Sequence, residues 1–161
     1  MPPSVEIRLA DEFDAEAIAS LLYAAFIEYK PLYTERAFAA TAIKADQVCL
    51  RLAEGPVWVA FRGGGLAGTV SALPRGRTLY IRGMGVLPSA RGQGLATALL
   101  RAAEDFALAG GFEAMLLSTT PFLDAAIQLY ERAGFLRSED GPSQLFHTPL
   151  FAMKKRVHPE T

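Results

Sequence analysis

A glycine-containing segment in the second half of the chain has the residue types of a phosphate-binding loop. Gly92 and Gly94 flank Gln93 at the point where an apolar strand has ended and an amphipathic helix begins. A helix start leaves backbone N–H groups unpaired and carries partial positive charge, and glycines let a ligand approach that backbone closely. Arg91 stands at the rim, where its guanidinium could add a charge-assisted hydrogen bond. The segment therefore predicts a cradle of main-chain donors for a pyrophosphate.

The spacing of these residues argues against two common nucleotide sites. A nucleoside triphosphate loop places Lys and then Ser or Thr after its last glycine, but Leu95 and Ala96 follow Gly94. The dinucleotide fingerprint G-x-G-x-x-G fails at its last position, which is occupied by Thr97. That fingerprint also follows the first strand of its unit, whereas this loop follows the fourth predicted strand. A different phosphate-bearing ligand is expected.

The apolar periodicity predicts the elements that must position this loop. Two helices are expected after the first strand, one capped by Asp14 and one running from Thr34 to Gly55-Pro56. A meander of three strands then leads into the glycine loop and its helix, which Gly110-Gly111 ends. The predicted strands are residues 5–9, 57–61, 66–73, 78–86, 112–118, a strand from 135 and a strand around 150–154. The fold class is α/β (α+β), a mixed, mostly antiparallel sheet of six to seven strands with helices on both faces.

Length and composition limit the classes of protein to consider. The 161 residues, 51% hydrophobic and 20% charged, predict one globular domain over residues 1–161, with a core of about 5–155 and a frayed C-terminal tail. The net charge is −1 and the Arg75–Arg77 segment is too short a basic run for a nucleic-acid surface. Cys49 is the single cysteine, which excludes an internal disulfide and any multi-cysteine metal site. No export signal and no membrane-spanning run is found, so a cytoplasmic protein without membrane contact is expected.

Three segments together resemble the Gcn5-related N-acetyltransferase (GNAT) family. Its signature Gln/Arg-x-x-Gly-x-Gly/Ala is met by Arg91, Gly94 and Ala96. Residues 126–135, an amphipathic helix that ends in Tyr and is followed by Gly-Phe, look like a later motif of the family. The segment 7–18 is similar to its common opening, and the order of elements matches from about Val5 to Lys155. The resemblance implies an acetyl-CoA-dependent transfer of an acetyl group to an amine.

The resemblance also implies where the cofactor lies. The fourth strand would splay from the fifth, and the backbone of Met84, Gly85 and Val86 would bind the pantetheine amides like an added strand. Gly83 and Gly85 around Met84 suit a β-bulge there. The pyrophosphate would lie on the N–H groups of the loop and helix start. The cofactor-binding residues implied are Met84, Gly85, Val86, Arg91, Gly92, Gln93, Gly94, Leu95, Ala96, Thr97 and Leu123.

Tyr130 matches the general acid of the family. A phenol with a pKa of ~10 stays protonated near neutral pH and can donate its proton to the departing coenzyme A thiolate. The alternative is a structural tyrosine on the buried side of its helix. No metal is implied, and the acceptor would be a small-molecule amine or a peptide amine. Dimers are common among similar proteins, so a homodimer is one expected assembly.

Two positions depart from the family pattern. Leu123 stands where many members have Asn, so one polar contact to the cofactor is expected to be missing. Arg82 stands where many members have a glutamate base. Glu28 or a chain of water molecules could take the amine proton instead. Arg82 itself has two interpretations, an anchor for a carboxylate on the acceptor or a salt-bridged strand residue.

The remaining candidate residues surround the predicted acceptor side or stand alone. Tyr29, Tyr33 and Phe38 flank the break between the first two helices and either line the acceptor pocket or only pack together. Cys49, between apolar neighbours, is predicted to be a buried structural thiol. His147 lies between the last two strands, where a minor role in proton transfer is open.

Three hypotheses from different classes remain after these considerations. The leading one is an enzyme in which the amine attacks acetyl-CoA directly. The alternative is a non-catalytic acyl-CoA-binding module, motivated by Leu123 and Arg82. The third is a structural or interaction protein that kept the fold, against which Gly92, Gly94 and Tyr130 argue.

Overall fold

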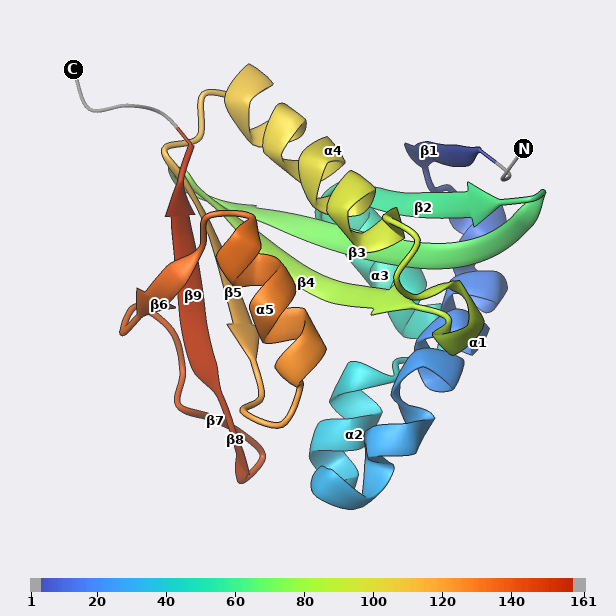
Figure 1. The fold of residues 1–161 in the computed structure, drawn as a ribbon, viewed down its shortest axis with the longest axis horizontal. Helices are drawn as coiled ribbons and strands as arrows, with labels where there is room; N and C mark the ends of the chain where they lie inside the picture. Colours follow the sequence, from blue (N-terminus) through green and yellow to red (C-terminus); the bar gives the residue numbers. More distant parts are fainter. Residues whose placement is uncertain (1–3, 158–161) are drawn as a thin grey trace.

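The computed structural model describes residues 4–157 and has a seven-stranded sheet between two layers of helices (Figure 1). The helices are α1 (Ala15–Phe26), α2 (Glu35–Thr41), α3 (Ala45–Glu54), α4 (Leu95–Ala109) and α5 (Asp124–Arg132), with short 3-10 turns at Glu12–Asp14, Ile27–Leu32 and Pro88–Ala90. The strands are β1 (Val5–Leu9), β2 (Val57–Arg62), β3 (Gly65–Arg75), β4 (Thr78–Val86), β5 (Ala114–Thr119), β6 (Leu136–Ser138), β7 (Gln144–Leu145), β8 (Thr148–Pro149) and β9 (Phe151–Arg156).

The main sheet is mixed and mostly antiparallel, as predicted. Its strand order is β1-β2-β3-β4-β5-β9-β6, and β4 and β5 form its one parallel pair within residues 4–157. The long β3 and β4 form the antiparallel centre of the sheet, and β7 and β8 make a separate small hairpin. The chain runs from β4 through α4 to β5, and this crossover makes β4 and β5 parallel. The pair thus joins the meander of β2, β3 and β4 to the second half of the chain.

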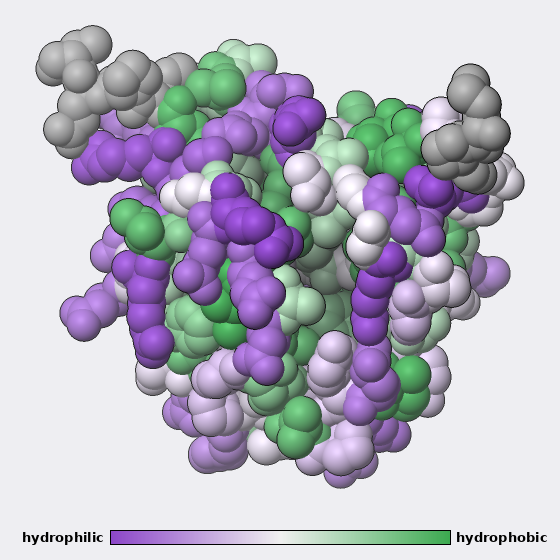
Figure 2. All heavy atoms as spheres, viewed as in Figure 1, coloured by the Kyte–Doolittle hydropathy of each residue, from purple (hydrophilic) through white to green (hydrophobic). Residues whose placement is uncertain are grey.

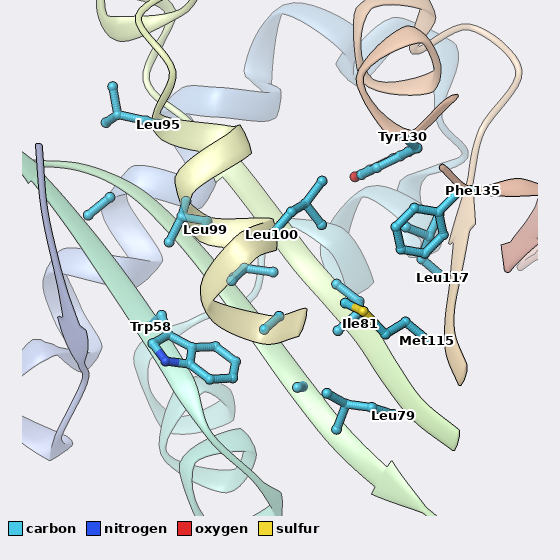
Figure 3. Packing of buried hydrophobic residues seen from close by; sticks show 14 of the residues in the cluster. Trp58, Leu79, Ile81, Leu95, Leu99, Leu100, Met115, Leu117, Tyr130 and Phe135 are labelled. Atoms are coloured by element: carbon cyan, nitrogen blue, oxygen red, sulfur yellow. The ribbon is translucent and has the colours of Figure 1, made fainter. Parts of the chain in front are cut away.

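Small residues in the sheet let helices approach from opposite sides. A Cβ at Gly68 would lie 3.1 Å from Leu99 of α4, and one at Gly85 would lie 3.1 Å from Leu22 of α1. The core on the α4 side contains Leu79, Ile81, Leu99, Met115 and Phe135 (Figure 3). A second core cluster lies between α1, α3 and the other side of β2. The sheet is therefore covered by α4 and α5 on one face and by α1 and α3 on the other.

The second predicted helix is in fact two helices, α2 and α3. The chain leaves the helix at Ala42, whose φ and ψ are −92° and 71°, and re-enters one after Lys44. Ile43, between them, is only 5% exposed and packs with the apolar residues of α1 and β2. Burying this side chain favours the break over a continuous helix. The prediction of one helix from Thr34 to Gly55 was wrong for this reason.

Other boundaries moved by a few residues. The helix expected near Gly92 begins at Leu95, β5 begins at Ala114 rather than at residue 112, and the hairpin of β7 and β8 was not predicted. Cys49 is exposed, not buried, because the inward side of α3 is set by its neighbour Val48, which is 2% exposed. The predicted frayed tail, residues 158–161, lies outside the described residues.

The packing of α4 on the sheet gives a stability prediction. Leu99 is fully buried against Gly68, so Leu99→Ala should lower the free energy of unfolding by about 2–5 kcal/mol, measured by urea denaturation. Leu50→Ala, at a helix position that is 65% exposed, is the control and should cost less than about 1 kcal/mol. Equal losses in the two variants would contradict this placement of α4.

Candidate active site

The two central strands part in the middle of the sheet. β4 and β5 pair from Thr78 with Ala114 to Ile81 with Leu117. Beyond that point β4 stays with β3 and β5 stays with β9, so the facing edges of β4 and β5 no longer bond each other. A cavity of about 680 Å³ occupies the gap and is lined by residues of both edges, Arg82–Val86 and Ser118–Thr120. The expected splay of these strands is thus present in the structure.

A β-bulge shapes the free edge of β4. Gly85 is opposite Thr69 and Arg82 is opposite Ser71, so Gly83 and Met84 together face the single residue Val70. Gly83 has a φ of +67°, a conformation that residues with a side chain rarely adopt. The bulge expected around Met84 is confirmed, and it changes which side chains point to each face of the sheet.

The glycine loop closes one end of the cavity. Gly92 and Gly94 have φ values of +76° and +85°, and a Cβ at either would meet no atom within 4 Å. The first helical hydrogen bond of α4 is donated by Ala98 to Gly94, whose position as N-cap provides no side chain. The N–H groups of Leu95–Thr97 therefore have no acceptor within the helix. This end of the cavity offers backbone donors and open space together.

Most of the predicted cofactor-binding residues line this one cavity. Gln93 is the exception, because its side-chain amide turns back to donate to Ser89 O at 3.4 Å. The residues brought together are Met84, Gly85, Val86, Arg91, Gly92, Gly94, Leu95, Ala96, Thr97 and Leu123. Hydrophobic and weakly polar side chains, green to white, form the floor of the central hollow in Figure 2, and hydrophilic side chains stand on both sides of it.

Tyr130 lines the cavity from α5 and is 7% exposed. Its ring contacts Phe135 edge-on, with the centroids 6.0 Å apart. Its oxygen is at the end of the ring that points away from α5 toward the side of α4 (Figure 3). Burial raises the pKa of Tyr130 above its ordinary value of 10, and the nearby Tyr33 acts in the same direction. The phenol is therefore held in its protonated form near neutral pH.

The guanidinium of Arg91 is directed toward α1. It donates to Glu28 and to the carbonyl oxygen of Ala25, the latter at 2.8 Å. Arg91 lines the cavity, whereas Glu28 does not belong to its walls. The carboxylate considered as a replacement base is thus engaged in an ion pair at the rim.

Comparisons with known proteins decide the family. A model of the acetyltransferase (GNAT) family matches residues 15–135, most of the chain. The chain belongs to the GNAT family. The match includes the parted strands, the glycine loop and the helix of Tyr130, so the resemblance found in the sequence is confirmed.

Two curated proteins illustrate the sequence similarity. The chain is 40% identical over 82 residues to N-acetylaspartate synthetase from Danio rerio, covering 50% of the chain and 29% of that protein. It is 38% identical over 92 residues to N-acetyltransferase family 8 member 2 from Rattus norvegicus, covering 53% of the chain and 41% of that protein. The matched segments therefore span less than half the length of these relatives.

Two solved structures show the same GNAT fold. PaiA N-acetyltransferase from Thermoplasma acidophilum, in complex with coenzyme A, superposes with a TM-score of 0.81 at 16% identity, covering 95% of this chain and 99% of that one. YncA from Salmonella typhimurium, with its cofactor acetyl-CoA, superposes with a TM-score of 0.75 at 23% identity, covering 98% and 96%. At these identities the likeness establishes the fold.

The acceptor-side residues predicted from the sequence are only partly in the cavity. Tyr29 and Tyr33 line it, while Phe38 packs behind them against Tyr33, with ring centroids 6.1 Å apart. Burial raises the pKa of Tyr33, and the neighbouring hydroxyls of Thr120 and Thr41 lower it. His147 is exposed in the turn between β7 and β8 and lies off the cavity walls.

Arg82 is salt-bridged, as one of its two sequence-based interpretations predicted, and it also faces the cavity. It lines the cavity, and its Nη2 donates to Glu54 at 2.9 Å. Its Nε is buried and has no hydrogen-bond partner within residues 4–157. Where many GNAT members have a glutamate base, this structure thus has an arginine with one hydrogen-bonded nitrogen and one buried nitrogen that is unpaired in the described chain.

Arg51 of α3 is a site residue that the sequence analysis missed. It lines the cavity beside Arg82, and its buried Nη1 has no hydrogen-bond partner in the described part of the chain. The pKa of Arg51 falls from 12.5 to about 10, chiefly because burial penalises the charge and next because Arg82 repels it. The sequence feature that could have indicated this residue is its position three residues after Val48, on the apolar side of a helix.

No metal centre is evident in the part of the molecule that is described. Among residues 4–157, no three His, Cys, Asp or Glu side chains lie close enough together to hold a metal ion. In the same range no helix is long and apolar enough to cross a membrane.

The unsatisfied charge of Arg51 predicts an unusual response to mutation. Because its pKa is lower in the folded state than in the unfolded state, folding costs free energy at every pH where Arg51 is protonated in the folded protein, below about 10. Arg51→Met should therefore leave the free energy of unfolding unchanged or raise it by up to about 2 kcal/mol at pH 7.

Arg8→Met is the control with the opposite sign. The hydrogen bond with Asp14 raises the pKa of Arg8, so this variant should lose up to about 1 kcal/mol in the same urea denaturation. A loss of more than 2 kcal/mol in Arg51→Met would mean that Arg51 is a structural residue.

Proposed function

We propose that this protein is an acetyl-CoA-dependent N-acetyltransferase that moves an acetyl group to an amine on a small molecule or peptide. The observation that carries the proposal is the continuity of one cavity. The free edge of β4, the donors at the start of α4 and the buried phenol of Tyr130 all line the same space, about 680 Å³ in volume. Membership of the GNAT family supports the choice of acetyl-CoA over other phosphate-bearing ligands.

The cofactor would extend along the gap between the parted strands. The edge groups of Met84–Val86 that β5 no longer bonds would serve the pantetheine amides as a neighbouring strand does. The N–H groups of Gly92–Thr97 would hold the pyrophosphate, because the space beside Gly92 and Gly94 is open and the start of a helix carries partial positive charge. Arg91 uses two of the five N–H donors of its guanidinium in its present bonds, which leaves donors for a phosphate oxygen.

The transfer would proceed by direct attack. The neutral amine nitrogen adds to the thioester carbonyl carbon, and the tetrahedral intermediate collapses with cleavage of the carbon–sulfur bond. The sulfur leaves as a thiolate and takes the phenolic proton of Tyr130, whose burial keeps that proton in place near neutral pH. The products are the acetylated amine and coenzyme A, and Tyr130 regains its proton from water.

The amine must also lose a proton, and the walls of the cavity provide no carboxylate for it. Among the described residues that line the cavity, none is Asp or Glu. Glu28 and Glu54, the nearby candidates, are paired with Arg91 and Arg82. We therefore assign this proton to water. An alkylamine is only about one part in a thousand neutral at pH 7.

Cofactor binding is the first prediction of this proposal. Isothermal titration calorimetry with acetyl-CoA should give saturable binding in the micromolar range, and Gly94→Trp should abolish it because the indole would fill the cradle. Gly64→Trp is the matched control, since Gly64 also has a positive φ, of 83°, and open space around its Cβ, but lies in the turn between β2 and β3. Lost binding in both variants, or in neither, would contradict the assignment of the cradle.

The assigned role of Tyr130 gives a second prediction. Tyr130→Phe should lower kcat by at least about 100-fold and leave the affinity for acetyl-CoA unchanged, because only the proton donor is removed. The readout is the release of the free thiol of coenzyme A. A kcat within threefold of the wild type would leave Tyr130 with a packing role only.

A non-catalytic acyl-CoA-binding module is the second candidate. The observation that favours it is the arginine at the position of the usual base, in a cavity whose described walls contain no carboxylate. This alternative predicts the same binding of acetyl-CoA, with the Gly94→Trp effect intact, but no thiol release with any amine.

A further inference from the structure

The charged side chains on the cavity walls are all of one sign. Within the described part of the chain they are Arg51, Arg82, Arg91 and Arg132. Arg91 and Arg132 come from the glycine loop and α5, two elements that line the part of the cavity proposed above for the cofactor. Arg51 and Arg82 come from α3 and β4, outside the glycine loop and helix start proposed to hold the pyrophosphate.

The β-bulge brings Arg51 and Arg82 together. Since two residues of β4 oppose one of β3, Gly83 faces α3 next to Arg82, and its missing side chain leaves room for Arg51. A Cβ at Gly83 would lie only 2.6 Å from Arg51 Nη1. The guanidinium of Arg51 thus rests against the bulge of the same strand edge that was assigned to the thioester arm.

One carboxylate, that of Glu54, is hydrogen-bonded to Arg82 and acts on Arg51 through its charge. Glu54 accepts from Arg82 Nη2, and its charge partly offsets the mutual repulsion of the two arginines. Arg51 Nη1 and Arg82 Nε are buried and without a hydrogen-bond partner within residues 4–157. An uncompensated buried cation is costly, so a purely structural pair would be expected to have its donors satisfied. The pair instead has a net positive charge and two buried donors that are unpaired among the described residues, and both side chains line the cavity.

We propose that Arg51 and Arg82 bind a carboxylate of the acceptor, so that the substrate class is amines that also carry a carboxylate, such as amino acids. This inference rests on the proposed function. Arg82 is two residues before Met84, on the order of 7 Å along the strand, so one small molecule can reach the arginines and the thioester together. A guanidinium matches a carboxylate with two parallel N–H···O bonds, which also fixes the orientation of the amine.

The rest of the same side of the cavity is apolar and aromatic. Phe26, Tyr29 and Tyr33 line it. The ring of Tyr33 packs edge-on against that of Phe122, with the ring centroids 4.9 Å apart. Such a wall would cover an apolar side chain and exclude water from the charge pair, which strengthens it. Phenylalanine is therefore a suitable first probe.

The test compares acceptors that differ in the carboxylate alone. The assay would contain acetyl-CoA and either an amino acid or its amide, beginning with phenylalanine and phenylalaninamide and continuing through the other standard amino acids. The acetylated product would be measured by mass spectrometry. We expect kcat/KM to be at least about 10-fold higher for the acid than for the amide in the pairs that react. The less basic amine of the amide is more often neutral, which biases the comparison against this result.

The outcomes separate this inference from the proposed function. The arginine assignment would be overturned if the amides reacted as fast as the acids or faster, or if only amines without a carboxylate reacted. Either result would leave the proposed acetyltransferase activity standing. No turnover of any amine, with acetyl-CoA bound, would overturn the proposed catalysis and the inference with it.

Variants test the two residues directly. Arg51→Gln and Arg82→Gln should each raise KM for the acid by about 10- to 100-fold and change KM for the amide by less than about threefold. Arg77→Gln is the matched control, because Arg77 also pairs with a glutamate, Glu113 at 2.8 Å, but lies at the exposed turn before β4. Unchanged affinity for acetyl-CoA in all variants checks the fold. Equal effects on acid and amide would overturn the proposal.

Discussion

The pairing between β4 and β5 stops at Ile81 and Leu117, and the rest of the site depends on that interruption. A parallel pair that continued would have bonded its own edges and left no room in the sheet. Instead each strand keeps its outer neighbour, so the sheet stays intact on both sides while a gap opens at its centre. The bulge at Gly83 and Met84 lies on this free edge of β4.

The gap joins two chemically different halves of one cavity. On the α4 and α5 side lie backbone donors and a buried phenol, which suit an anionic cofactor and the protonation of a leaving group. On the α1 to α3 side lie aromatic rings and two arginines, one of which is paired with Glu54. Both halves present positive charge or hydrogen-bond donors, which is the basis for proposing that each half binds a ligand with negative charge.

Much of the fold and of the cofactor half could be predicted from the sequence, because both depend on local patterns. Gly92 and Gly94 are recognisable from residue type alone, and the helix of Tyr130 has regular apolar spacing between clear end signals. The break between α2 and α3 could not be predicted, since it depends on where Ile43 becomes buried in three dimensions. The hairpin of β7 and β8 has strands of two residues, too short to give a pattern.

The half of the cavity proposed for the acceptor was less predictable, because it too depends on contacts between residues far apart in the sequence. Arg82 was noticed only because a resemblance placed it where an acid is usual. Arg51 belongs to no motif, and it becomes a site residue only when the bulge at Gly83 leaves room for it beside Arg82. The exposure of Cys49 depends likewise on which side of α3 meets the sheet. Such properties follow from long-range packing, which neighbouring residues in the sequence do not encode.

A crystal structure of the protein grown with coenzyme A would test the central claim most directly. The pantetheine is expected along the free edge of β4, with its amides bonded to the backbone of Met84–Val86, and the pyrophosphate on the N–H groups of Gly92–Thr97. Coenzyme A bound elsewhere, or β4 and β5 closed on each other with the gap empty at saturating cofactor, would contradict the claim that the parted strands form the cofactor site.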